Sequence, residues 1–155
     1  MLVSNAPVLR SFVAAAAVVV ALPVLAALPQ RTFVRSDGSD SNPCSLASPC
    51  RGFAAAVAAV AAGGEVNVLD SAGYGSATIT KSVSLISPAG IFAGVSVFPG
   101  SDGITVNAGS GTVVLRGLSI NGHGGTHGVA LQSAGRLRIE NCVISASLTP
   151  PAPRA

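Results

Sequence analysis

The sequence predicts an all-β fold: a right-handed parallel β-helix (β-solenoid) of about three to four coils with an N-terminal capping α-helix. The main evidence is a repeat in which apolar residues recur at one constant offset, from Leu115 to Ile139 and from Ile120 to Ile144. A repeat of this length, built from short alternating segments separated by Gly and Asn, is typical of stacked coils that bury their inner faces on one another. The right-handed sense follows from the strong preference of parallel crossovers.

Composition supports thin, regular layers. Of 155 residues, 49% are hydrophobic but only 4% are aromatic and 10% charged, so the core must be built from small and branched aliphatic side chains. Nine Lys and Arg against six Asp and Glu give a formal net charge of +3. Because the basic residues are scattered along the chain, no nucleic-acid partner is predicted.

The N-terminus, residues 1–27, is predicted to be a signal peptide. Arg10 precedes an uncharged run over residues 11–30, and small residues near position 26 suit cleavage. The alternative is an uncleaved anchor over residues 12–28, a run whose length is at the short limit for a spanning helix. Cleavage predicts a secreted, periplasmic or cell-surface protein without membrane contact.

Residues 28–64 are expected to form an N-terminal cap that contains a strand, a cysteine loop and the helix. Cys44 and Cys50 enclose a short loop and are predicted to form a structural disulfide, which fits an oxidising compartment. Zinc would need further ligands, and none lies nearby in the sequence. Cys142 lies one repeat after Leu118 at an inward position, so it is predicted to be a buried small apolar residue rather than a nucleophile.

The capping helix is predicted from its start and stop signals. Ser48 suits the N-cap, Pro49 the first helical position, and the glycines at 63–64 the end. A helix of about three to four turns would cover the open first coil, whose edge would otherwise template aggregation. Its apolar face is expected at Phe53, Val57 and Val60.

The coils are predicted over residues 65–146, where the sequence alternates between apolar and polar residues. Gly117 and Asn141 occupy equivalent positions between paired segments and tolerate a left-handed backbone, so they are predicted corners. The same register places Arg116 beside Glu140 on the outer face as an ion pair. Strands are expected at residues 65–68, 77–80, 82–86, 94–97, 103–106, 113–120, 128–131 and 137–144.

The pattern ends in a Pro-rich tail, residues 147–155, which contains three prolines. The last coil is therefore expected to be exposed. One interpretation is that the chain is truncated or frame-shifted relative to a longer solenoid. The other is that a partner or a second copy covers the last coil.

The N-terminal half resembles the opening of secreted bacterial right-handed parallel β-helix proteins, the pectin-lyase-like superfamily. The resemblance rests on an aromatic-Val strand at 31–34, a G-x-D-x-N-P turn at 38–43, a Pro-preceded helix, a Gly-rich stop with a strand at 63–68, and Gly-Tyr-Gly at 73–75. It covers residues 31–86 by motif and the remaining coils by repeat pattern alone. The superfamily includes pectate lyases, polygalacturonases and surface adhesins, so the resemblance implies a fold rather than an activity.

The residues that enzymes of this superfamily use are not grouped in the sequence. Lyase members are known for clustered carboxylates on calcium plus a basic residue, whereas Glu65, Asp70, Asp102 and Glu140 are widely separated and Lys81 is the sole lysine. No catalytic, cofactor-binding or metal-binding residues are therefore predicted.

Two motifs resemble sites but lack the residues that such sites need. Residues 122–124 match the Gly-His-Gly of polygalacturonases, but the aspartates that those enzymes need are missing, so His123 is assigned to a Gly-rich turn. A metal on His123 and His127 lacks a third ligand. The oxygen-rich loop 36–42 lacks the closing Glu of a calcium loop and is predicted to be a turn.

The expected function is that of an exported, non-catalytic β-helix scaffold that binds a polysaccharide or a cell-surface component. The alternative is a pectin-type polysaccharide lyase or glycoside hydrolase, or an inactive truncated fragment of one. The candidate surface contacts are His123, His127, Arg116 and Arg138, and the outward polar positions Thr78, Thr80, Ser84 and Ser119 could contribute.

Overall fold

The structure is a computed structural model that describes residues 27–146. The predicted signal peptide, apart from Ala27, and the predicted Pro-rich tail lie outside these residues. The described residues form twelve strands and one short helix. These elements are β1 (Arg31–Val34), α1 (Phe53–Ala59), β2 (Gly64–Val68), β3 (Ala72–Gly73), β4 (Ala77–Ile79), β5 (Val83–Ile86), β6 (Ala93–Val97), β7 (Asp102–Asn107), β8 (Thr112–Arg116), β9 (Leu118–Gly122), β10 (His127–Ser133), β11 (Arg136–Glu140) and β12 (Val143–Ala146).

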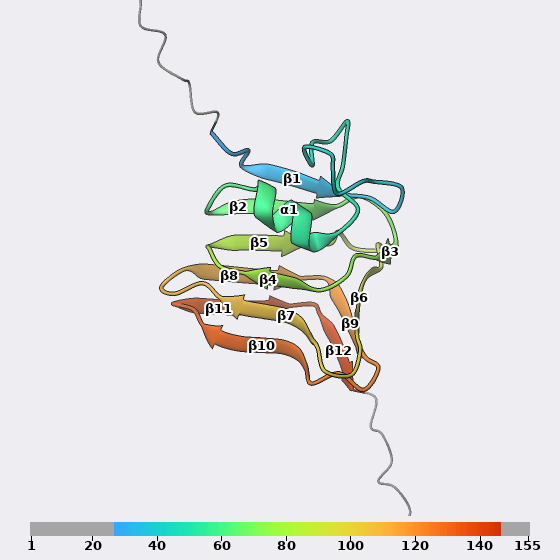
Figure 1. The fold of residues 1–155 in the computed structure, drawn as a ribbon, viewed down its shortest axis with the longest axis vertical. Helices are drawn as coiled ribbons and strands as arrows, with labels where there is room; N and C mark the ends of the chain where they lie inside the picture. Colours follow the sequence, from blue (N-terminus) through green and yellow to red (C-terminus); the bar gives the residue numbers. More distant parts are fainter. Residues whose placement is uncertain (1–26, 147–155) are drawn as a thin grey trace, which may run out of the picture.

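The strands form three parallel sheets that the chain visits in rotation (Figure 1). The first sheet has the order β1-β2-β5-β8-β11, the second β3-β6-β9-β12, and the third β4-β7-β10. Every pairing between named strands is parallel, and from β2 onward each sheet receives one strand in turn. The prediction of an all-β chain with one helix is confirmed.

The constant offset of the sequence repeat predicts the strand register of the last two coils correctly. Ile139 pairs with Leu115 and Ile144 with Ile120. The earlier coils differ in length, because the chain from Leu85 to its next partner Leu115 is longer than the chain from Val66 to Leu85. The connections between strands therefore absorb changes in length while the strands stay in register.

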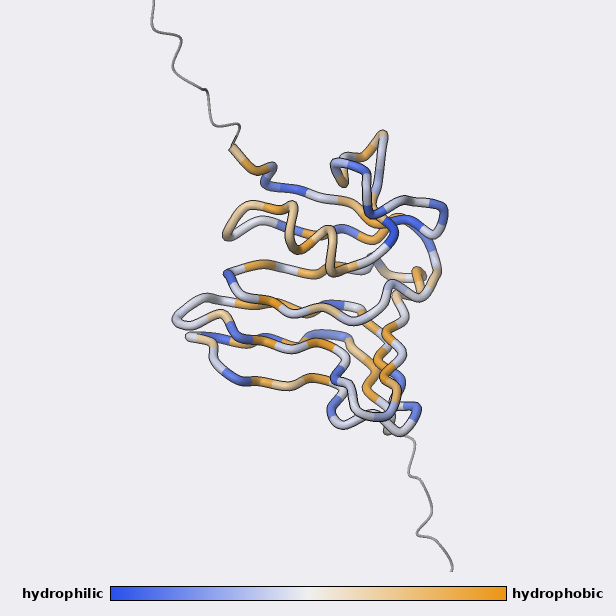
Figure 2. The backbone as a smooth tube through the Cα atoms, in the orientation of Figure 1, coloured by the Kyte–Doolittle hydropathy of each residue, from blue (hydrophilic) through white to orange (hydrophobic). Residues whose placement is uncertain are grey.

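The core consists of aliphatic side chains that stack from one strand to the next. Val66, Leu85 and Leu115 follow one another in register in the first sheet, and all three are fully buried. Along the tube in Figure 2, hydrophobic and hydrophilic residues alternate within the strands, as expected for strands with one buried face. The low aromatic content suits these thin layers.

Helix α1 begins later than predicted, and the assignment of Ser48 as its N-cap is wrong. The helix covers seven residues, or about two turns, and follows Gly52. The reason lies in Cys50, whose amide donates to Phe33 O at 2.9 Å and whose carbonyl accepts from Arg35 N at 3.0 Å. These bonds hold Cys50 in an extended pairing next to β1, so a helix cannot start before it.

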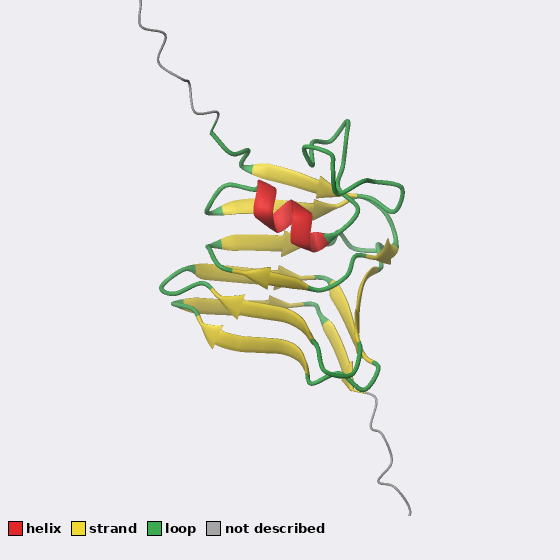
Figure 3. Ribbon diagram, viewed as in Figure 1, coloured by secondary structure: helices red, strands yellow, loops and turns green. Residues whose placement is uncertain are grey.

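The helix also ends earlier than the predicted glycines at 63–64, at Ala59. Lys81 Nζ donates to Ala58 O at 3.3 Å and to Val60 O, and so satisfies carbonyls that a short helix leaves free. The helix packs against β1, β2 and β4 and lies near the N-terminal end of the sheets (Figure 3), where the loop that contains Cys44 and Cys50 pairs with the outer edge of β1. Its predicted apolar residues are buried: Phe53, Val57 and Val60.

The predicted corners have the expected backbone. Gly117 has φ = 72° and Asn141 has φ = 53°, both in the left-handed region. At Gly117 the backbone is also crowded, because an added Cβ would lie 2.5 Å from Ser87 O. One strand was missed by sequence reasoning: β3 spans only two residues, too few for alternation to be visible.

The inward residues of the last coil are less buried than their partners one repeat earlier, which fits the expected exposure of this coil but not the predicted burial of Cys142. Ile144 is 49% exposed although its register partner Ile120 is fully buried. Cys142 is half-buried rather than buried, with its Sγ 3.4 Å from Leu115 O. Both differences have one cause: among residues 27–146, no further strand stacks on β11 or β12.

We predict that Gly117→Ala destabilises the protein more than Gly109→Ala. Both glycines have positive φ, so each alanine costs about 1–2 kcal/mol in backbone strain. A Cβ at position 109 meets nothing within 4 Å, whereas one at position 117 must push Ser87 aside, which adds about 1–3 kcal/mol. Urea unfolding followed by circular dichroism measures both; equal losses would contradict the crowding argument.

Candidate functional site

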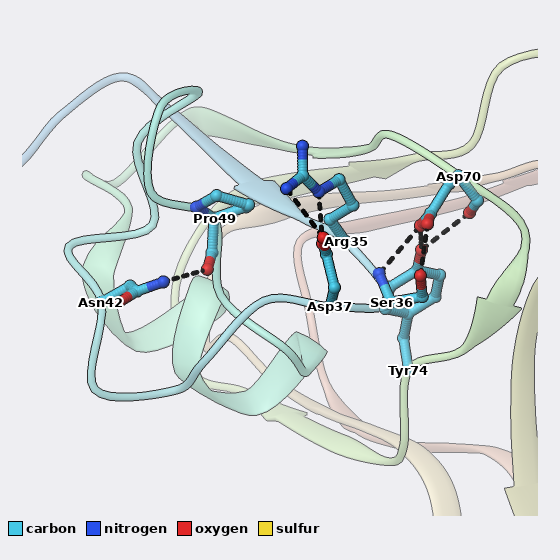
Figure 4. Close-up of polar contacts among 7 residues, drawn as sticks. All are labelled: Arg35, Ser36, Asp37, Asn42, Pro49, Asp70 and Tyr74. Atoms are coloured by element: carbon cyan, nitrogen blue, oxygen red, sulfur yellow. Dashed lines mark hydrogen bonds and ion pairs between the residues drawn. The ribbon is translucent and has the colours of Figure 1, made fainter.

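A cluster of polar contacts joins the loop after β1 to the turn after β2 (Figure 4). Asp70 Oδ1 accepts from Ser36 N at 2.9 Å, and Asp70 also accepts from the hydroxyls of Ser36 and Tyr74. The Tyr74 hydroxyl donates to Asp70 O as well, at 2.7 Å. The tyrosine ring is buried and packs 5.3 Å from Phe53, between centroids. The cluster therefore fastens the cap to the first coil.

The electrostatics of this cluster favour a structural role. Burial tends to raise the pKa of Asp70, but the bonds from Ser36 and Tyr74 outweigh it and hold that pKa below its ordinary value. Burial, together with the bond to Asp70, raises the pKa of Tyr74. Asp70 stays ionised and Tyr74 stays protonated at neutral pH, so neither is tuned to exchange a proton.

The oxygen-rich loop 36–42 is a turn, as predicted, and its side chains bind protein groups. Asp40 Oδ1 accepts from the amides of Arg51 and Gly52 at 2.9 and 2.8 Å, just before α1. Asn42 Nδ2 donates to Pro49 O at 2.8 Å (Figure 4). The predicted disulfide between Cys44 and Cys50 is present, with the two Cα atoms 4.6 Å apart.

An open groove of about 570 Å³ lies at the corner between the first and second sheets. The connection from β5 to β6, residues 87–92, is longer than the single residue Gly117 between β8 and β9. The longer corner forms one wall of the groove, and Arg116, Gly117 and Asn141 lie opposite. Both predicted corners thus line the groove.

Arg116, which lines the groove, shares the carboxylate of Glu140 with a second arginine, Arg138. Arg116 Nη2 lies 2.7 Å from Glu140 Oε2, and Arg138 Nη2 lies 3.0 Å from Glu140 Oε1. The predicted contact between Arg116 and Glu140 is confirmed. The hydrogen bond from Arg116 lowers the pKa of Glu140, so the carboxylate stays ionised. Two guanidinium groups against one carboxylate leave one positive charge in this cluster, of which Arg116 lines the groove.

The predicted histidines lie elsewhere, at the corner between the second and third sheets. His127 Nδ1 is 2.8 Å from Asp102 Oδ1, its register partner on β7. His123 stacks on the exposed ring of Phe98, with centroids 5.6 Å apart. His127 lines a small pocket of about 150 Å³ that does not include His123.

Sequence reasoning paired neither His123 with Phe98 nor His127 with Asp102. Asp102 and His127 are separated by nearly the same offset as the repeated apolar residues, and this spacing could have indicated their contact. The structure therefore groups Arg116 with Arg138 and keeps the histidines apart from both.

All six carboxylates of the chain lie within the described residues, and each contacts a protein donor or cation. Over residues 27–146, no group of three His, Cys, Asp or Glu is arranged to hold a metal ion. The contacts are Asp37 with Arg35, Asp40 with the amides before α1, Glu65 with Arg31, Asp70 with Ser36 and Tyr74, Asp102 with His127, and Glu140 with Arg116 and Arg138.

Comparisons with family models, curated proteins and solved structures found no match to this chain. The class of the protein is therefore defined by its own features: three parallel sheets, a disulfide-stapled cap and a groove that Arg116 lines. No helix among residues 27–146 has the length and apolar character needed to cross a membrane. The disulfide between Cys44 and Cys50 is compatible with an extracellular location.

We predict that Asp70→Asn lowers stability by about 1–3 kcal/mol at neutral pH, because it weakens charge-assisted bonds to Ser36 and Tyr74. Since the pKa of Asp70 is lower in the folded state, its contribution is present above the ordinary Asp pKa of about 3.9 and is lost as pH falls through the folded value. Thermal melts of the wild type should fall more steeply below about pH 4 than those of the variant. Tyr74→Phe, which keeps both Ser36 bonds, is the control and should retain the steep fall.

Proposed function

We propose that this chain is an exported, non-catalytic right-handed parallel β-helix that binds an acidic polysaccharide at the groove beside Arg116. The fold part of the proposal is supported by three parallel sheets that the chain visits in rotation, with one strand in each sheet per turn. Right-handedness follows from the general preference of parallel crossovers. The binding part is supported by the charge and shape of the groove.

The observation that carries the proposal is the surplus guanidinium in the cluster of Arg116, Arg138 and Glu140, of which Arg116 lines the groove. Arg116 and Arg138 both engage Glu140, so one positive charge is left for a ligand. Guanidinium groups suit carboxylates because they donate two parallel hydrogen bonds. A uronic acid residue carries such a carboxylate on a polar ring. The open shape of the groove also suits a polymer, which must pass through rather than end in it.

Neighbouring strands extend the polar surface along the first sheet. Register partners on neighbouring strands form rows across the outer face of this sheet. One row contains Ser84 and Arg138 on either side of Val114, and the next row contains Arg116 and Glu140. Strands in a sheet lie about 4.8 Å apart, so the two arginines are presented at the spacing of one strand. A sugar chain can therefore contact hydroxyl and guanidinium groups on adjacent strands.

Export is supported by the disulfide and by the apolar N-terminal run. The non-catalytic interpretation is supported by the carboxylates, because each of them already contacts a protein donor or cation. A glycosidase needs two carboxyl groups about 5–10 Å apart and facing one bond, and those of this chain are distributed over separate contacts.

Calorimetric titration with polygalacturonate, and with neutral dextran as the comparison ligand, tests the proposal. We expect binding of polygalacturonate only, weakening with added salt. Arg116→Gln should reduce the affinity about tenfold, the amount expected when one charged hydrogen-bonding group is lost. Arg31→Gln is the matched control, because Arg31 also pairs with a glutamate on the neighbouring strand of the same sheet but shares it with no second arginine.

Equal losses from both variants would show binding by general charge and would overturn the groove assignment. The appearance of unsaturated or reducing ends during the incubation would overturn the non-catalytic reading. In that case His123→Ala would test whether the histidine corner is responsible. Lys81→Ala is less informative, since Lys81 bonds the end of α1.

A further inference from the structure

The C-terminal end of the three sheets is an open face. Strands β10, β11 and β12 each stand last in their sheet and pair on one side only, with β7, β8 and β9. They lie together at the lower end of the molecule in Figure 1, opposite the end near which α1 lies. Each strand therefore presents a row of free backbone N–H and C=O groups in the same direction.

The core is exposed at this face. Ile139, Ile144 and Leu131 continue the inward stacks of the three sheets and are 45%, 49% and 58% exposed. Their register partners one strand earlier are all fully buried: Leu115, Ile120 and Val106. An apolar centre with three free strand edges around it is an unfinished interface rather than a finished surface.

We propose that this face binds the same face of a second copy of the chain, forming a head-to-head dimer. The proposal does not depend on the groove. A two-fold axis through the middle of β11 would place β11 antiparallel to β11 of the second copy. It would also place β10 of each copy opposite β12 of the other. An occupant that pairs with all three free strand edges at once must present three strand edges in a matching arrangement. A second copy does so by symmetry.

The sequence of β11 complements itself in this arrangement. With Arg138 on the axis, Arg136 faces Glu140 of the other copy twice, and Leu137 faces Ile139 twice. Residues directly opposite in antiparallel strands point to the same side, so the charged pairs lie outside and the aliphatic pairs inside. The one like-charge contact is Arg138 with itself, and each Arg138 is already paired with its own Glu140 at 3.0 Å.

The symmetry also limits the assembly to two copies. At the opposite end the loop that contains Cys44 and Cys50 pairs with the outer edge of β1, so this end offers no matching set of strand edges within residues 27–146. A contact that uses the same face on both molecules closes on itself and does not propagate into a fibre. Residues 147–155 contain three prolines, which lack the N–H needed to pair with a strand edge.

Sedimentation equilibrium of the purified full chain tests the proposal. We expect a dimer in the wild type, and at least a tenfold higher dimer dissociation constant for Ile139→Asp, which places a carboxylate in the apolar centre. Leu46→Asp is the matched control: Leu46 is 61% exposed in the disulfide loop at the other end, so this variant should remain a dimer. Any association through the N-terminal apolar run would persist in both variants.

Two further variants test the register and guard against a fold defect in Ile139→Asp. Arg136→Glu places like charges opposite Glu140 and should weaken the dimer at least tenfold, while Arg138→Ser removes the like-charge contact on the axis and should strengthen it about twofold or more. A monomeric wild type, which would point to another occupant of the face, overturns the proposal. A dimer insensitive to both Ile139→Asp and Arg136→Glu overturns it as well.

Discussion

The structure depends on one constraint: aliphatic side chains must stack in register from each strand to the next in the same sheet. Val66, Leu85 and Leu115 exclude water only because their strands pair without a shift. A slip of one residue would move every inward side chain to the outside. The cap, the corners and the outer ion pairs are arranged around this register, and the exposure of Ile139 shows what happens where the stack stops.

The carboxylates of the chain serve the parts of the fold that lie outside the apolar stacks. With only six carboxylates, the protein uses Asp40 to hold the residues before the helix, Asp70 to fasten the cap, and Glu140 to tie together two arginines. Each contact secures a part of the fold that apolar stacking does not reach. What remains for recognition is a surplus of positive charge at one corner, which is why the proposed ligand is an anion.

The sequence predicts the features that repeat and misses those that depend on single long-range contacts. Apart from the two-residue strand β3, the strands after residue 64 follow from alternation. The left-handed corners at Gly117 and Asn141 and the pair of Arg116 with Glu140 follow from the fixed offset. The predicted helix start is wrong because Ser48 and Pro49 give a sound local signal that the pairing of Cys50 with β1 overrides. The groove could not be foreseen, since it arises from a difference in corner length rather than from a motif.

That difference in corner length has an evolutionary consequence. From β2 onward, successive strands of the first sheet are joined by stretches of unequal length, shortest between β2 and β5 and longest between β5 and β8, yet their inward side chains remain aligned. Insertions and deletions at the corners therefore leave the core unchanged and alter only the shape of the outer surface. A fold of this kind can acquire or lose a binding site by changing the length of one corner loop, so related chains with the same scaffold can be expected to differ in what they recognise while sharing almost all of their interior.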